Sequence, residues 1–225
     1  MIDYNNFFKL VEIEDDEKPS AIEYIKYRGL IEHIKMAKHL SSFIIDRKPM
    51  YKEVATVFRY DKRLRRIIYK YIGFLEEYFH SFICNNFASP KEIGIVSKQT
   101  TYDYCNSSLF SKTVDIIWSL NAEQKNELFE NKNHLKKNLD ALVRLRNVVS
   151  HNRSLLNYRD FKEVTLPSGE VGHSLLINVE NLSFVLPNLV SESFVKEIND
   201  ASRLGEKKRN NQVGWSLPSF IIVKL

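Results

Sequence analysis

The sequence is poor in glycine, proline and cysteine. Only 7 Gly and 6 Pro occur among 225 residues, which leaves little material for tight-turned β-sandwiches. Leu, Ile, Lys, Glu and Asn are plentiful, and this composition favours helices. The two cysteines, Cys84 and Cys105, form no CxxC pair, so the sequence indicates neither a zinc site nor a disulfide framework. We therefore expect a mainly α-helical protein without a metal site.

Long apolar runs are missing as well. No stretch approaches the roughly 18 apolar residues of a membrane span, and residues 1–20 lack a basic stretch followed by an apolar one. We expect a cytoplasmic protein with no membrane partner. Lys and Arg outnumber Asp and Glu by 33 to 28, which gives a formal charge of +5. This modest excess suits nucleic acid without requiring it.

Apolar periodicity predicts most of the helices. From about Asp61 to Asn85, apolar residues lie within about 100° of one another at 100° per residue, as in a long half-buried helix. Further helices are expected over 20–34, over 109–120, after a cap at Asn121, from about Asn133 onward, and over 187–203. In the first of these, Ser20 is the expected cap and Gly29 is expected to break the helix.

The remaining segments are less regular. Residues 36–61 predict a short helix and a loop, because Pro49 biases Lys48 out of helical geometry. A loop that can include a short helix is expected over 86–107. A small hairpin or irregular excursion is expected around 167–169, a basic loop over 206–211, and a strand or irregular apolar segment over 215–225. We expect one domain over 1–225, in which 161–225 form an extension packed on the helical core.

A stripe of cations follows the long predicted helix. Its members are spaced four, three and four residues apart, on the side opposite the apolar face: Arg59, Arg63, Arg66 and Lys70. Such a stripe is either a solvated helix face or a surface that contacts RNA phosphates. The sequence leaves both interpretations open.

The most informative segment is LVRLRNVVSHNRSLLN, residues 142–157, at the end of an amphipathic helix. Arg146 lies on the helical wheel beside Leu139 and Leu142, so its guanidinium points into or along the apolar seam, which is costly unless it is paired or functional. Asn147 and His151 are four residues apart, so the amide can orient the imidazole. Arg146 and His151 are about 140° apart, which suits a cleft between packed helices.

These residue types suffice to cleave RNA. An imidazole exchanges protons near neutral pH, and an arginine can hold a phosphate while negative charge develops on it. The ribose 2′-OH supplies the nucleophile, so the reaction needs no cofactor, metal or protein nucleophile. The structural alternative is an Arg146 paired to a core acid and a His151 that caps the helix.

Arg146-Asn-Val-Val-Ser-His151 resembles the R-x4-6-H motif of the HEPN superfamily. Its surroundings resemble a block of the abortive-infection (Abi-like) proteins, in which Ser150, Arg153 and Asn157 also match. A second block, FRYDKRLRRIIYKYIGFLEEYF over 58–79, is similar to another segment of that family. The matching residues there are Phe58, Tyr60, Asp61, Leu64, Arg65 and Glu76. Four residues after Glu76 the family often has an arginine, where this chain has His80, so no role carries over to that position.

The resemblance covers roughly residues 20–160 and implies a HEPN-like helical bundle with extra N-terminal helices. It implies a metal-independent endoribonuclease of an abortive-infection antiphage or toxin-type system. In that reading His151 is the general acid/base, Arg146 the phosphate clamp and Asn147 the orienter of the histidine. It also implies a homodimer with a composite cleft, and products that end in a 2′,3′-cyclic phosphate. The alternative is a non-catalytic HEPN module that binds RNA or a partner protein, and a bound RNA or protein antitoxin is a further expected partner.

Several residues have two interpretations. Arg153 either binds RNA together with the stripe or is simply solvated. Glu76 and His80 are expected to form a structural pair rather than a second catalytic dyad. Four other histidines are not spaced as metal ligands would be: His33, His39, His134 and His173. Trp118 and Trp215 are expected in the core or at a subunit contact.

Overall fold

The computed structural model describes residues 4–44, 46–95 and 99–203. The expectations for 206–211, 215–225 and Trp215 fall outside these ranges. The described chain is mainly helical, as expected. Its N-terminal helices are α1 (Asn5–Phe8), α2 (Lys18–Arg28), α3 (Leu30–Ser41) and α4 (Tyr51–Asn86). They are followed by a 3₁₀ turn η1 (Pro90–Ile93), α5 (Thr101–Ser107), α6 (Phe110–Ser119), α7 (Ala122–Leu128), α8 (Lys136–Ser150), α9 (Leu175–Val185) and α10 (Asn188–Arg203).

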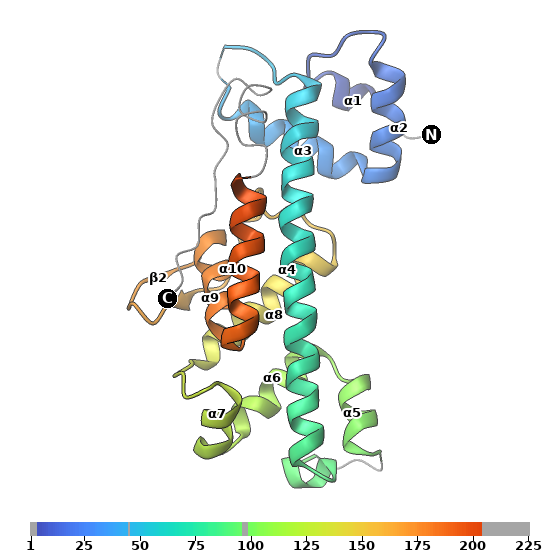
Figure 1. The fold of residues 1–225 in the computed structure, drawn as a ribbon. Coiled ribbons are helices and arrows are strands. Elements are labelled where there is room, and N and C mark those ends of the chain that lie inside the picture. The colour runs from blue at the N-terminus through green and yellow to red at the C-terminus, as the bar shows by residue number, and fades with distance from the viewer. Residues whose placement is uncertain (1–3, 45, 96–98, 204–225) are drawn as a thin grey trace.

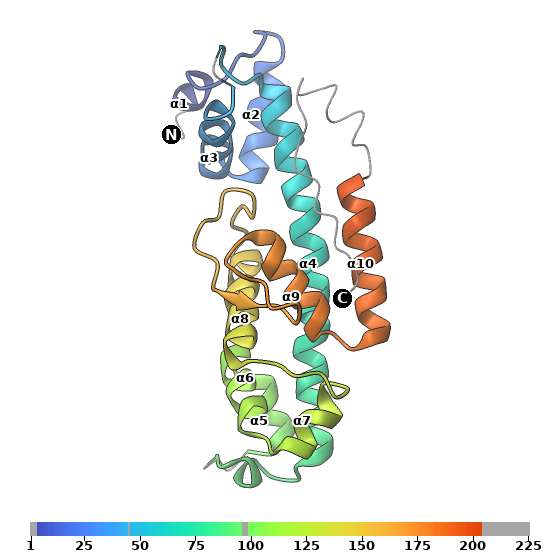
Figure 2. The ribbon, with the colours of Figure 1, turned by 90° about the vertical axis from the view of Figure 1, so that its left-hand side faces the viewer.

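The 36-residue helix α4 runs the length of the molecule (Figure 1). At 1.5 Å per residue it is about 54 Å long. Helices α1 to α3 pack around its beginning, and α5, α6 and α7 gather near its end. Beside its middle, α4 contacts α8, α8 contacts α9, α9 contacts α10, and α10 returns to α4 (Figure 2). These four helices form a closed ring around the main core.

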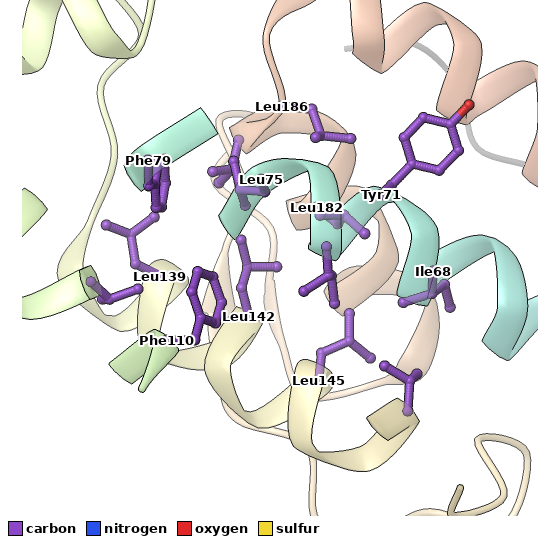
Figure 3. Close-up of a cluster of buried hydrophobic side chains, with 14 of the residues drawn as sticks. Ile68, Tyr71, Leu75, Phe79, Phe110, Leu139, Leu142, Leu145, Leu182 and Leu186 are labelled. Carbon is purple, nitrogen blue, oxygen red and sulfur yellow. The ribbon is translucent and has the colours of Figure 1, made fainter. Parts of the chain in front are cut away.

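Two hydrophobic clusters lie along α4. The larger one fills the four-helix ring and continues to α6 (Figure 3). Its central residues are Ile68, Tyr71, Leu75, Phe79, Phe110, Leu139, Leu142, Leu145, Leu182 and Leu186. The second cluster joins α1 to α3 with the beginning of α4 through Phe7, Val11, Ile25, Met36, Leu40, Val54 and Val57. Leu156, after α8, packs against both clusters.

The predicted break at Gly29 is confirmed. Helix α2 ends at Arg28 and α3 begins at Leu30, with Gly29 between them at φ +94°, a conformation that glycine adopts at little cost. Ser20 does not cap α2, because the helix begins at Lys18 and Pro19 lies in its first turn. A proline is tolerated there because the first N–H groups of a helix have no intrahelical partner.

The prediction for 36–61 was wrong in its second half, since α4 begins at Tyr51 rather than near Asp61. Pro49 does interrupt the chain, but it lies just before the new helix. Glu53 then caps that helix through a 2.6 Å hydrogen bond that its carboxylate accepts from the Met50 amide. Glu53 also pairs with Arg47. The capping acid is three residues after the cap, a signal that the sequence did contain.

Beyond α8 the expected hairpin is confirmed, but the structure also has a helix there that the sequence did not predict. Strands β1 (Val164–Thr165) and β2 (Val171–Gly172) pair antiparallel. The sequence pattern predicts an irregular excursion for the segment that follows these two strands, but that segment forms α9. Helix α9 packs against α8, α10 and β1 and is apolar around most of its circumference, so it lacks the one-sided pattern of an amphipathic helix.

Candidate functional site

The motif helix α8 ends at a fixed point. His151 is its C-cap, and Asn152 follows in the left-handed region at φ +57°. The Asn152 amide donates to the Val149 carbonyl at 3.2 Å, and the Arg153 amide donates to the Val148 carbonyl at 3.1 Å. This is a Schellman motif in which asparagine replaces the usual glycine. This motif places His151 at the end of the last turn of α8, and His151 is exposed there.

The loop after His151 is anchored to α4 by a buried ion pair. Asp61 accepts a 2.8 Å hydrogen bond from Arg65 Nε, and both side chains are almost fully buried. The other Asp61 oxygen accepts hydrogen bonds from the Ser154 hydroxyl at 3.0 Å and the Leu156 amide at 2.9 Å. Arg65 Nη1 also donates to the side-chain oxygen of Asn152. Residues 152–156 are therefore held by α4 at several points.

Burial has the largest effect on the pKa of the Asp61 carboxyl, and the contacts of this network oppose it only in part. Burial raises the pKa of the Asp61 carboxyl, whereas Arg65, the Leu156 amide and the Ser154 hydroxyl act in the opposite direction. Because the anchor joins residues 61 and 65 to residues 152–156, it links the two sequence blocks that carry the family resemblance.

Arg146 faces α4. Its Nε donates to Glu76 Oε1 at 3.1 Å, and 32% of the Arg146 side chain and 22% of the Glu76 side chain are exposed. The guanidinium thus lies at the edge of the apolar seam and is paired with an acid, but neither side chain is buried in the core as the structural alternative expected. One nitrogen takes part in this bond, so the exposed part of the guanidinium can still approach a phosphate.

Asn147 and His151 lie on an exposed side of α8, and Arg146 lies at the edge of that side, against α4. Asn147 and His151 are both exposed, and Asn147 lies between Arg146 and His151 on the helical wheel. Asn147 is joined to His151 by the helical hydrogen bond from the His151 amide to the Asn147 carbonyl at 3.1 Å. Because α8 stays helical to Ser150, the offset of about 140° between Arg146 and His151 remains.

The members of the cationic stripe differ in their surroundings. Arg59, Arg63, Arg66 and Lys70 are all exposed, as predicted. However, Lys70 pairs with Glu197 of α10 at 2.5 Å. On the wheel of α4, Lys70 lies about 120° from Glu76, the partner of Arg146. Arg66 instead lies within electrostatic range of Lys62, as does Arg28. Arg153 is exposed in the loop directly after His151.

Sequence reasoning missed three residues near this site. Glu32, in the first turn of α3, accepts a 3.4 Å hydrogen bond from the Ser154 amide, so the N-terminal helices reach the His151 loop. Lys62 lies within electrostatic range of Arg28, Arg66 and Arg65. The position of Lys62 between stripe and apolar face could be read from the wheel, but the approach of Arg28 and Glu32 depends on tertiary packing.

His80 and Glu76 do not form the expected pair. His80 Nε2 lies 3.0 Å from the Thr113 hydroxyl of α6, and Glu76 pairs with Arg146. Burial lowers the pKa of His80, while Glu76 and Glu77 oppose that shift. His80 lines a hollow of about 410 Å³ with Glu77, Ser81, Cys84, Asn85, Tyr102 and Asn106, and a second hollow of about 510 Å³ lies between α1, α2 and the beginning of α4.

Within the described ranges, no group of three or more His, Cys, Asp and Glu side chains is arranged to hold a metal ion. Cys84 and Cys105 are free thiols. None of the described helices has the length and apolar content needed to cross a membrane. Trp118 is half-buried against the main core, and the Lys125 ammonium lies 4.6 Å from the centre of its ring.

Comparison of the chain with known protein families, curated proteins and solved structures gave no match.

Proposed function

We propose that this protein is a metal-independent endoribonuclease of the HEPN type, acting in an abortive-infection or toxin-type system. The observation that carries the proposal is the meeting of two distant sequence blocks. Asp61 and Arg65 of the first block hold the loop that follows His151, and Glu76 of the first block holds Arg146. A sequence pattern shared with a family supports a function more strongly when its separate blocks lie around the same candidate residues in the fold.

The chemistry follows from the residue types. The ribose 2′-oxygen attacks the adjacent phosphorus, the bond from phosphorus to the 5′-oxygen breaks, and a 2′,3′-cyclic phosphate remains. One imidazole takes the 2′-OH proton, and an acid returns a proton to the departing 5′-oxygen. Arg146 stabilises the charge that develops on the phosphate, while Glu76 fixes the direction of its guanidinium.

The same chemistry supports a homodimer. Arg146 and His151 of one copy point about 140° apart on α8, so one copy does not aim both groups at the same phosphate. A second copy related by a twofold axis brings another Arg146 and another His151 to a shared cleft. We propose this composite cleft as the working form of the site.

The test is RNA cleavage by the purified protein in excess EDTA, with His151→Ala beside it. We expect cleavage to persist in EDTA and to fall by about 10²- to 10⁴-fold in His151→Ala, the usual contribution of a general acid/base. His173→Ala, which removes another exposed histidine, is the matched control and should cleave normally. Strict metal dependence, or a His151→Ala activity within threefold of wild type, would contradict the proposal.

A non-catalytic RNA-binding module is the second candidate. The ion pair between Arg146 and Glu76 favours it, because an arginine already neutralised by an acid is a weaker clamp for developing charge. RNA binding without cleavage by the wild-type protein would select this module. Co-purification of RNA or of a second protein would add the antitoxin expected from the resemblance.

A further inference from the structure

Helix α4 presents an aromatic ring at the candidate site. Tyr69 is 53% exposed although its ring is large and apolar. On the helical wheel it lies about 40° from Arg65 and about 20° from Glu76. These two residues contact Asn152 and Arg146, which lie on either side of His151 in the chain. Tyr69 therefore belongs to the strip of α4 that faces the end of α8.

The height of Tyr69 along α4 also matches the site. Arg65 is one turn before it and Glu76 two turns after it, so Tyr69 lies about 6 Å and about 10 Å from them along the axis. Because Arg65 holds Asn152 and Glu76 holds Arg146, the level between them is the level of His151. An exposed ring next to a phosphate-cleaving group is well placed to stack on a base.

Cations gather around Lys62, which lies on the same side of α4 as this ring. Lys62 lies two turns before Tyr69 and about 20° from it on the wheel. Arg28, Arg66 and Arg65 lie close enough to Lys62 to lower the pKa of its ammonium, after the larger effect of burial. In the part of the chain that the structure describes, no carboxylate lies within ion-pair distance of Arg28, Lys62 or Arg66. Like charges held together in this way favour a polyanion as the ligand.

Two features position Arg28 at this place. Gly29 ends α2, so Arg28 is its last residue. The first turn of α3 then reaches the His151 loop through the bond between Glu32 and the Ser154 amide. The N-terminal helices thereby bring a cation from outside the four-helix ring to the same side as Asn152.

We propose that Tyr69, Lys62 and Arg28 form a track for single-stranded RNA that leads into the Arg146–His151 site. Tyr69 stacks on a base next to the reacting phosphate, and Lys62 and Arg28, with Arg66, bind the phosphates beyond it. The track rests on the proposed ribonuclease function and names its substrate class. A single strand is chosen because only unstacked bases can lie on a tyrosine ring, whereas duplex RNA hides its bases.

A second copy of the chain fits this surface less well. In a twofold contact the same patch meets itself, so the cations around Lys62 would repel one another. The composite cleft proposed above therefore leaves this part of α4 for the RNA.

The test measures binding of a fluorescein-labelled single-stranded RNA 12-mer of mixed sequence, in a His151→Ala background that prevents the proposed cleavage. We expect Tyr69→Leu to weaken binding about 5- to 160-fold, as removal of one stacking contact does, and Tyr69→Phe to bind normally. The pair Lys62→Glu and Arg28→Glu should reduce the slope of log affinity against log salt by at least about 1.4, or about 0.7 for each phosphate that is no longer neutralised.

Arg63→Glu is the matched control. It makes the same charge reversal one residue from Lys62, but on a side of α4 about 120° from Tyr69. Equal weakening of RNA binding in Arg63→Glu and Lys62→Glu would reveal a diffuse charge effect and overturn the track. Unchanged RNA affinity in Tyr69→Leu would overturn the track too. If that variant also shifted from dimer to monomer, the face of α4 that carries Tyr69 would belong to the contact with a second copy.

The outcomes separate the track from the proposed function. If wild-type protein does not cleave RNA but the Tyr69 and Lys62 variants bind RNA more weakly as expected, the nuclease fails and the track stands. If wild-type protein cleaves and His151→Ala does not, while the track variants bind like their parent, the nuclease stands and the track fails.

Discussion

Histidine is used in two opposite ways in this protein. His151 is exposed at the end of α8, whereas His134 lies between the rings of Phe129 and Phe184, 4.4 and 4.5 Å from their centres. Neither ring nitrogen of His134 has a hydrogen-bond partner among the described residues. Burial, with Lys132 nearby, lowers the pKa of His134 to about 4. At neutral pH His134 is therefore an uncharged aromatic ring in a helix junction.

That burial predicts a pH-dependent stability. The folded pKa of His134 lies below the unfolded value near 6.5, so the unfolded chain binds more protons between pH 6.5 and about 4. The contribution of His134 to the free energy of unfolding should be fully present above pH 6.5 and should fall as the pH is lowered through this window. The loss from this residue is up to about 3 kcal/mol. We expect urea unfolding of His134→Leu to depend less on pH than that of wild type, and His173→Leu to behave like wild type. Parallel pH profiles for wild type and His134→Leu would contradict this assignment.

At the scale of elements, the contact between α4 and the His151 loop decides the shape of the site. Helix α8 ends where the Schellman motif ends it, but the chain beyond it is directed by Asp61. The loop is therefore positioned by a helix that is distant in sequence, and a defect in α4 will be felt at His151.

Removing the charge of Asp61 tests this coupling. Asp61→Asn keeps the shape of the side chain but leaves Arg65 buried without a counter-ion, which should cost about 3 to 5 kcal/mol in unfolding free energy. Glu163→Gln is the control, because its ion pair with Lys137 is exposed to solvent and should contribute little to stability. Equal destabilisation of the two variants, measured by urea unfolding, would mean that Asp61 does not hold the loop as described.

The sequence predicted these elements unevenly. Helices with one apolar face, such as α6, α8 and α10, could be recognised because their periodicity survives in the sequence. Helix α9 could not, because it is enclosed on several sides and apolar around most of its circumference. For the site, Arg146 and His151 could be selected from the motif, whereas Glu32 and Arg28 approach it only through tertiary packing.

At the scale of the whole molecule, α4 joins both hydrophobic clusters and carries the groups that hold α8 in place. The ends of α4 are occupied by other helices, and the middle faces the candidate site. One chain therefore presents Arg146 and His151 at two edges of an exposed surface. The proposed dimer supplies the missing half of the cleft.

Mixing two inactive variants tests the dimer. If the Arg146 and His151 that act on one phosphate come from different copies, Arg146→Ala and His151→Ala should complement each other. With random exchange, half of the dimers are mixed and each retains one intact combination, so roughly a quarter of wild-type activity should return. A mixture that stays inactive although light scattering and exchange show mixed dimers would contradict a shared cleft, and a monomer in solution would exclude the dimer.

The long separation between Asp61 and its loop partners sets the order in which the site is built. Ser154 and Leu156 follow Asp61 by 93 and 95 residues. A ribosome that adds about 5 to 20 residues per second needs about 5 to 20 s to pass from one to the other. During that time the first half of α4 can form from local contacts, but His151 has no anchored loop. A nascent or truncated chain that stops before Leu156 thus lacks the assembled site, and synthesis itself delays any activity until most of the bundle exists.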